Sequence, residues 1–385
     1  MIRRRGGSPL EDDDMLGEIL LRLPPQPSSL PRASAVCKRW RGLLTNPGFL
    51  RRFRTHHREP PLLGVFHQLE FTPVLAAPDR IPFGCLDLPT RDLWGRLLDC
   101  RHGRVLILHR FRPEVLVCDP IMGDQQCVPI PPEFKRGYLN GTVLCAACDK
   151  GHVHGGCHST PFKVVLLLSN DRRPLTSVYS SETGTWGGLI STEVPCLYSC
   201  NGYISTLVGN VLYWSFMYAK MCILGFDLER QSIDVIKGPP GMNRTHSHRI
   251  IQAEDGTVAI VMLSYRYQNI QIWHMKVNCH GVSTWVLWKT IETDNILGLP
   301  TQVGGEQELL KYILGYVEDT DGIFLDVNDS IYMVQLNSLQ SRKLCETRDI
   351  TSYHSFRSFY AAGARETSLP ALLVDLHYAA LLGKW

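Results

Sequence analysis

The chain has 385 residues, of which 44% are hydrophobic and 20% are charged, and its formal net charge is +3. This composition excludes a disordered chain and allows one small module beside a large domain. No apolar run is long enough to span a bilayer, and the charged start MIRRRGGSP lacks the apolar core of a secretory signal.

The thirteen cysteines are scattered and do not form the framework of a small disulfide-bonded scaffold. We therefore expect reduced thiols and a cytoplasmic or nuclear location. The basic residues near the N-terminus are not interleaved with aromatic residues as in a base-stacking platform. They indicate a solvated helix face, and we expect no nucleic-acid partner and no membrane partner.

Residues 9–53 predict three short amphipathic helices. Ser8 is expected to cap the first helix, with Pro9 in its first turn and Glu11 completing a capping box. The first apolar stripe consists of Met15, Leu16, Ile19, Leu20 and Leu23, and Pro24-Pro25 end that helix. The second helix is expected after Ser28 or Ser29, with apolar positions from Leu30 to Leu44. Asn46-Pro47 predicts the start of a third helix that carries Phe49, Leu50 and Phe53.

So small a helical unit cannot bury all of these apolar side chains internally. Some of them must face a partner, or the helices must cap a larger domain. The order of residues favours a partner, because it resembles the F-box of large plant, grass-type families. The matching positions are Leu16, Ile19, Leu20, Leu23, Pro24, Ser29, Leu30, Val36, Cys37, Lys38, Trp40, Leu43, Leu44, Pro47 and Phe49.

The resemblance implies that the helices bind a Skp-type adaptor, which links to a cullin. It assigns adaptor binding to Leu10, Leu16, Ile19, Leu20, Leu23, Pro24, Leu30, Val36 and Trp40, some as contacts and some as core. Two features depart from the family pattern. The usual Leu-Pro start reads Pro9-Leu10-Glu11, and the proline-rich segment PPQPSSLP separates the first two helices.

From residue 62 to about residue 365 the sequence shows short β-branched and aromatic runs separated by turn residues. A weak repeat of strand, polar turn and second strand starts at Val115, Ser177, Ile223, Ile270 and Ile331. The starts lie roughly 45 to 60 residues apart, which is about the length of one propeller blade. The repeat predicts a β-propeller of about six or seven blades. A β-sandwich or a mixed β-rich fold is the alternative, and the domain resembles the β-propellers that follow plant F-boxes.

The segment CAACDKGHVHGGCH contains six candidate zinc ligands, namely Cys145, Cys148, His152, His154, Cys157 and His158. However, residues 143–147 read as a strand, on which Cys145 and Cys148 would face opposite sides. We therefore expect no metal and no cofactor, and leave zinc as the alternative. No nucleophile elbow, phosphate loop or dinucleotide fingerprint is present, so we expect no catalytic residue.

The predicted architecture is an α+β multidomain chain, with an F-box at 8–56, a linker at 57–64 and an all-β domain at 65–385. The predicted function is that of a non-catalytic substrate receptor in an SCF-type ubiquitin ligase, with an unknown target protein bound by the β-domain. Candidate target loops are Tyr265-Arg266-Tyr267 and Gly241–Arg249. The alternatives are an F-box scaffold outside ubiquitination, a poorly folding family member, and a carbohydrate-reading propeller that uses Trp186, Trp214 or Trp285.

Overall fold

The N-terminal part of the computed structural model is a helical module of four helices. They are α1 (Asp13–Leu21), α2 (Ser29–Ser34), α3 (Lys38–Leu44) and α4 (Pro47–His57). The structure describes residues 12–82, 84–86, 88, 95–135, 137–147, 152–158, 160–169, 173–193, 204–217, 221–242, 247–264, 269–279, 281–293, 296, 311–346 and 352–360.

The caps explain where the helices begin. Asp12 caps α1, since its carboxylate accepts the N–H groups of Asp14 and Met15 at 2.8 and 3.1 Å. The helix therefore begins later than the predicted Ser8 cap, and Ser8 lies outside the described residues. The prediction of a cap at Asn46 is confirmed, because its side chain accepts the N–H groups at the start of α4.

The prediction of one continuous second helix is wrong. Cys37 is extended, with φ −163° and ψ 167°, and it separates α2 from α3. Its sulfur accepts the N–H of Trp40 at 3.5 Å, so that Cys37 acts as the cap of α3. The near-helical spacing of the apolar residues on both sides of Cys37 conceals this break in the sequence.

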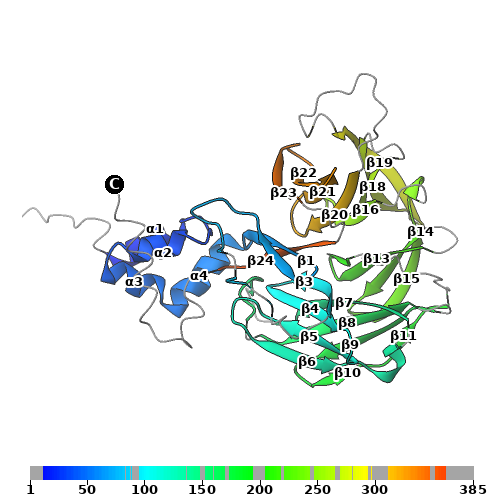
Figure 1. Cartoon of the computed structure of the whole chain (residues 1–385), viewed down its shortest axis with the longest axis horizontal. Helices are drawn as coiled ribbons and strands as arrows, with labels where there is room; N and C mark the ends of the chain where they lie inside the picture. Colours follow the sequence, from blue (N-terminus) through cyan, green and yellow to red (C-terminus); the bar gives the residue numbers. More distant parts are fainter. Residues whose placement is uncertain are drawn as a thin grey trace, which may run out of the picture.

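The helical core also includes side chains from outside the module. Leu16, Leu20 and Phe53 are buried with Val153 and Phe359, which belong to the β-domain. The N–H of Ser28 donates to the Asp79 carboxylate at 3.0 Å. These contacts dock the helices on the β-domain, and Figure 1 shows α4 at the junction with α1, α2 and α3 farther out.

The β-domain is a six-bladed β-propeller, which confirms the predicted fold (Figure 1). Five blades are consecutive in sequence. Listed from the inner to the outer strand, the first two are β3 (Gly95–Arg101), β4 (Arg104–His109), β5 (Glu114–Cys118) and β6 (Gln125–Pro129), and then β7 (Tyr138–Cys145), β8 (Phe162–Ser169), β9 (Leu175–Ser180) and β10 (Thr185–Trp186), with β11 (Ile190–Ser191) also paired to β9. The third consists of β12 (Thr206–Val208), β13 (Val211–Met217), β14 (Met221–Asp227) and β15 (Ser232–Lys237), and the fourth of β16 (His248–Gln252), β17 (Val258–Leu263), β18 (Asn269–Val277) and β19 (Ser283–Glu292). The fifth consists of β20 (Lys311–Val317), β21 (Gly322–Val327), β22 (Ser330–Gln335) and β23 (Ser341–Glu346).

The remaining blade is built from both ends of the propeller domain. Strand β1 (Leu62–His67) pairs with β2 (Glu70–Pro73) on one side and with β24 (Tyr353–Arg357) on the other. Because β1 begins at Leu62, the last residues of the predicted linker belong to this blade. The C-terminal segment LPALLVDLHYAALLGKW, left open between strand and helix, lies outside the described residues.

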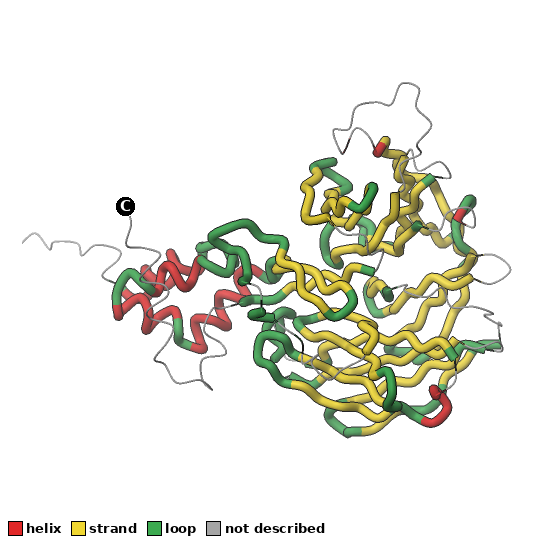
Figure 2. Tube along the Cα trace, viewed as in Figure 1, coloured by secondary structure: helices red, strands yellow, loops and turns green. Residues whose placement is uncertain are grey.

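The five repeats found in the sequence each coincide with the two outer strands of one blade. The pairs are β5–β6, β9–β10, β14–β15, β18–β19 and β22–β23. A local period of two and a polar turn were therefore sufficient to predict these hairpins. Figure 2 shows that strands dominate the domain, which also has short helical turns such as Pro132–Lys135, and that α1 to α4 are gathered in the other part of the molecule.

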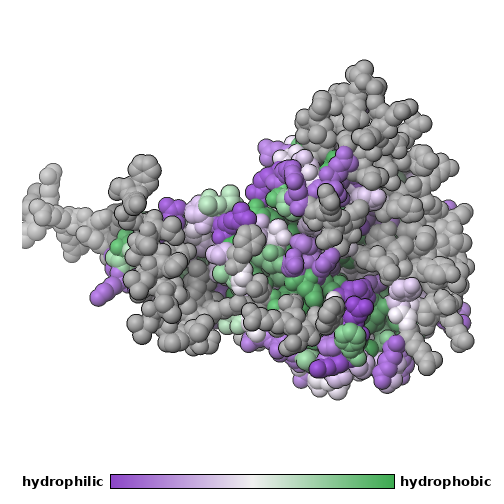
Figure 3. Space-filling model, in the orientation of Figure 1, coloured by the Kyte–Doolittle hydropathy of each residue, from purple (hydrophilic) through white to green (hydrophobic). Residues whose placement is uncertain are grey.

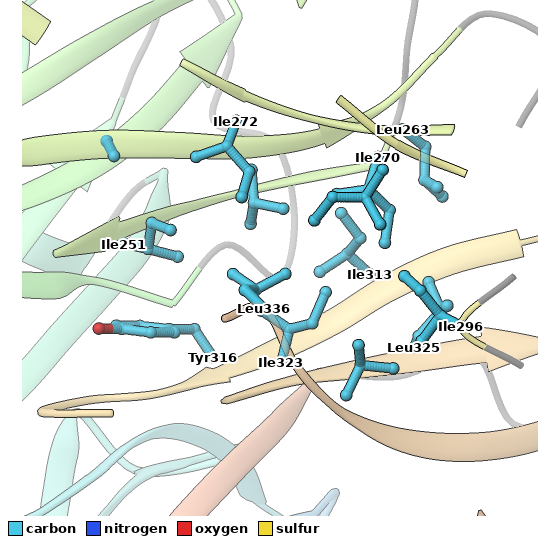
Figure 4. Close-up of a cluster of buried hydrophobic side chains, with 14 of the residues drawn as sticks. Ile251, Leu263, Ile270, Ile272, Ile296, Ile313, Tyr316, Ile323, Leu325 and Leu336 are labelled. Atoms are coloured by element: carbon cyan, nitrogen blue, oxygen red, sulfur yellow. The ribbon is translucent and has the colours of Figure 1, made fainter. Parts of the chain in front are cut away.

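The hydrophobic core lies between neighbouring blades, where the faces of two sheets meet. One cluster joins Ile251, Ile270 and Ile272 of one blade to Ile313 and Ile323 of the next (Figure 4). Corresponding clusters fill the other blade junctions, including those on both sides of the closing blade. Full burial of one such aliphatic side chain contributes about 1.5–3 kcal/mol, so the closed ring gains from every junction.

A buried polar network joins the inner parts of several blades. The Arg101 guanidinium, at the end of β3, donates to the Asp99 carboxylate at 2.7 Å and to Glu318, after β20, at 2.7 and 2.5 Å. It also donates to Thr142 on β7 and to the carbonyl of Ser205 before β12. Arg101 therefore connects four blades near the middle of the ring.

Candidate functional site

Helix α1 exposes apolar side chains on the side that faces away from the core of the helical module. Met15 is 50% exposed and Ile19 is 39% exposed, and their spacing of four residues places them side by side on the helix. Val36, between α2 and α3, is 62% exposed. We call these three side chains the apolar face of the helical module.

An ion pair brings the two parts of the apolar face to the same end of the module. Arg39, at the start of α3, binds the Asp13 carboxylate, at the start of α1, with an N–O distance of 2.7 Å. Val36 lies three residues before Arg39, and Met15 lies two residues after Asp13. Figure 3 shows hydrophobic residues beside hydrophilic ones at the end of the module that is farthest from the propeller.

The structure separates the nine predicted adaptor-binding residues into three groups. Ile19, Pro24 and Val36 are exposed; Leu23, Leu30 and Trp40 are partly buried against the helical core; and Leu16 and Leu20 are fully buried in it. Leu10 lies outside the described residues. Leu16 and Leu20 can therefore support the surface but do not form it, and substitutions there would test folding rather than binding.

Met15 is not among the residues predicted to bind the adaptor. Its spacing to Ile19 was the available signal, because residues four apart share one helix face. The same stripe also contained Leu16 and Leu20, and helical spacing alone did not separate the buried side from the exposed one.

The strand ends that flank the predicted target loops lie toward the face of the propeller opposite the helical module. The module joins the ring where β1 begins, beside the end of β24, since Leu62 pairs with Arg357. Strand β17 ends at Leu263 and β18 begins at Asn269, at the other end of the antiparallel pairs. Tyr265-Arg266-Tyr267 lies outside the described residues, as does much of Gly241–Arg249.

The three tryptophans considered as sugar contacts have structural roles. Trp214 is 1% exposed and lies in the core. The indole N–H of Trp186 donates to the carbonyl of Pro129 at 2.8 Å, and that of Trp285 donates to the carbonyl of Lys237 at 2.7 Å. Each of these bonds joins the outer strand of one blade to the outer strand of the preceding blade.

Four of the six candidate metal ligands converge at the junction between the propeller and the helical module. The nearest nitrogen or sulfur atoms of Cys145, His152, His154 and Cys157 all lie within 4.8 Å of one another. His158 instead binds the Asp119 carboxylate at 2.6 Å, and Cys148 lies outside the described residues. We call this group the β7–β8 cluster.

Among the described residues, no helix is long and apolar enough to cross a membrane. Comparison with curated proteins found no match. Solved structures that match this chain share low sequence identity with it. A chain of a nidogen/laminin complex is 10% identical with a TM-score of 0.41, covering 76% of this chain and 95% of that one. A chain of Kuenenia stuttgartiensis hydrazine synthase is 9% identical with a TM-score of 0.40, covering 72% of this chain and 78% of that one.

Two family matches correspond to the two parts of the structure. The F-box domain family matches residues 12–52, which contain α1, α2, α3 and the first half of α4. The second match spans residues 96–357, from β3 to the end of β24. The chain therefore has an F-box followed by a propeller, and it belongs to the family described as "F-box protein AT5G49610-like, beta-propeller".

Proposed function

We propose that this protein is the substrate-recognition subunit of an SCF-type ubiquitin ligase. The observation that carries the proposal is the apolar face of the F-box, which remains exposed although the apolar side chains of the helical core, such as Leu16 and Leu20, are buried. A Skp-type adaptor binds this face, and a cullin joins through the adaptor. The protein performs no chemistry itself and acts by holding a target near the conjugating enzyme, which raises the effective concentration.

The position of the apolar face supports this arrangement. It lies on α1 and between α2 and α3, whereas α4 connects to the propeller (Figure 1). An adaptor on the outer helices would leave the propeller ring accessible. The target then binds the propeller face opposite the F-box, where loops between strands gather.

A pull-down with a recombinant Skp-type adaptor tests adaptor binding. We expect Ile19→Asp/Val36→Asp to weaken binding at least about tenfold, or about 1.4 kcal/mol, because it places two carboxylates in an apolar interface. Its melting temperature should stay near that of the wild type, since both side chains are exposed. Val277→Asp is the matched control, because Val277 is 60% exposed on the propeller and Val36 is 62% exposed on the F-box.

Failure of the wild-type chain to bind the adaptor would overturn the proposal, as would full binding by the double variant. A second assay separates the ligase from a scaffold. Loss of the protein should raise the amount of at least one bound target if the ligase proposal holds, whereas unchanged levels of all bound proteins would favour the scaffold.

A further inference from the structure

The β7–β8 cluster has the geometry of a four-coordinate metal site. The Cys145 sulfur and the Cys157 sulfur each lie 3.3 Å from Nε2 of His152, and the Cys157 sulfur lies 3.7 Å from Nδ1 of His154. Zinc bonds of about 2.3 Å to sulfur and 2.0–2.1 Å to nitrogen place the ligands of a tetrahedron about 3.5 Å apart. The observed distances lie on both sides of this value.

The chemistry of the four ligands favours zinc. Two thiolates and two neutral imidazoles form a Cys₂His₂ set, which is typical of structural zinc and also neutralises the charge of Zn²⁺. All four positions are filled by the protein, as in closed structural sites, so a catalytic role is not expected. We propose that the β7–β8 cluster binds one Zn²⁺ ion that fixes the connection between β7 and β8.

Neighbouring groups hold the ligands in place, as the second shell of a metal site does. The Cys145 sulfur lies 3.3 Å from the Thr160 hydroxyl and accepts the N–H of Ala147 at 3.5 Å. The His154 ring stacks on His102, with ring centroids 3.7 Å apart. Arg104 donates to the carbonyl of Cys157 and so fixes the backbone of the last ligand.

A metal would be useful in this connection, because residues of the connection contact the F-box. Val153, between the two histidines, packs into the F-box core. The carbonyl of Gly155 accepts the N–H of Phe359 at 3.0 Å and the Ser358 hydroxyl at 2.8 Å. Gly156 lies against the Arg54 guanidinium of α4, so that an added Cβ there would require the Arg54 side chain to shift.

The described residues of this connection contain no helix or strand to define its shape. Among them, residues 152–158 have turns. A bound ion would join the end of β7 to the residues before β8 and so hold Val153 in the F-box core. The zinc would therefore set the position of the F-box on the propeller, independently of which partner the F-box binds.

The test is the metal content of the full chain, purified under reducing conditions without chelator. We expect one zinc per chain, and less than about a tenth of that in Cys145→Ser/Cys157→Ser. Cys127→Ser/Cys279→Ser is the matched control, because both residues are exposed free cysteines of the propeller, and it should retain the metal. Unchanged tryptophan fluorescence would show that the propeller remains folded in both variants.

Two further measurements keep the result decisive. Wild-type chain stripped of metal should rebind Zn²⁺ with a Kd tighter than about 100 nM. Co²⁺ in its place should give the visible absorption of a tetrahedral thiolate site, which His152→Ala should change. Failure of the stripped chain to rebind zinc would overturn the proposal, as would full zinc in the Cys145/Cys157 variant.

Discussion

Removal of the Arg101 side chain is expected to destabilise the propeller more than the loss of any surface charge. Arg101 and Asp99 are almost fully buried, with side chains 4% and 1% exposed, and the Glu318 side chain is 23% exposed. In Arg101→Met both carboxylates lose their cation while they remain in the structure. Breaking a buried ion pair by removing one partner costs about 3–5 kcal/mol.

The loss should be measurable by urea denaturation followed by tryptophan fluorescence, to which the buried Trp214 contributes. With an m value of about 3 kcal/mol/M, the midpoint should fall by about 1 to 1.7 M. Arg230→Met is the control, because Arg230 is 83% exposed and lies 3.9 Å from Asp227. It should change the free energy of unfolding by less than about 0.5 kcal/mol.

The dependence on pH provides an independent check. Burial raises the pKa of Asp99, although the positive charge of Arg101 lowers it. Without Arg101 the pKa rises further, so the neutral acid becomes the favoured form in the folded state. A carboxyl with a raised folded-state pKa destabilises the protein as pH rises through that pKa. The deficit of Arg101→Met should therefore be larger at pH 8 than at pH 5.

Neutralising both carboxylates should restore most of the lost stability, because no unpaired charge then remains. We expect this of Arg101→Met/Asp99→Asn/Glu318→Gln. A deficit below about 1 kcal/mol in Arg101→Met, or one that grows as pH falls, would show that the network does not hold the blades in the way described.

Two further predictions concern single positions in the β20–β23 blade. Burial, and then the nearby charge of Asp329, raises the pKa of Asp326 to about 6, so the ionised form is destabilising above that pH. Asp326→Asn should melt higher than the wild type at pH 8 and lose this advantage below about pH 4, near the pKa of an unfolded aspartate; a pH-independent difference would refute the assignment. At Gly315 an added Cβ would collide with the carbonyl of Tyr353 on the closing strand, so Gly315→Ala should lower the melting temperature. Gly188→Ala meets no atom within 4 Å and serves as its control; equal melting temperatures would argue against a tight contact between β20 and β24.

The local elements of the fold could be predicted from the sequence, but their long-range pairing could not. The hairpins starting at Val115 and Ile223 show alternation and a turn within one short window, and both are present. The pairing of β1 with β24 joins distant segments, and neither strand carries a signal for the other. The break at Cys37 also escaped prediction, because the apolar spacing continues across it.

The residues of the candidate sites could also be predicted from the sequence only in part. Helical spacing identified Ile19 and Val36 together with Leu16 and Leu20, but only the packing of α1 against α4 separates the surface from the core. In the Cys/His segment the spacing drew attention to Cys145 and Cys148. The structure instead brings Cys145 to Cys157, because the chain folds back between β7 and β8.

The closure of the ring has a consequence for the order of events during synthesis. Leu62 and Arg357 pair in the closing blade although 295 residues separate them. At a synthesis rate of about 5–20 residues per second, β1 leaves the ribosome roughly 15 to 60 s before its partner strand exists. Throughout this interval β1 and β2 form an unsealed hairpin with a free strand edge, which can pair wrongly with other chains. The newly made F-box is thus attached to a hairpin whose strand edge is still free. That edge is covered only when β24, the last described strand to be made, pairs with β1.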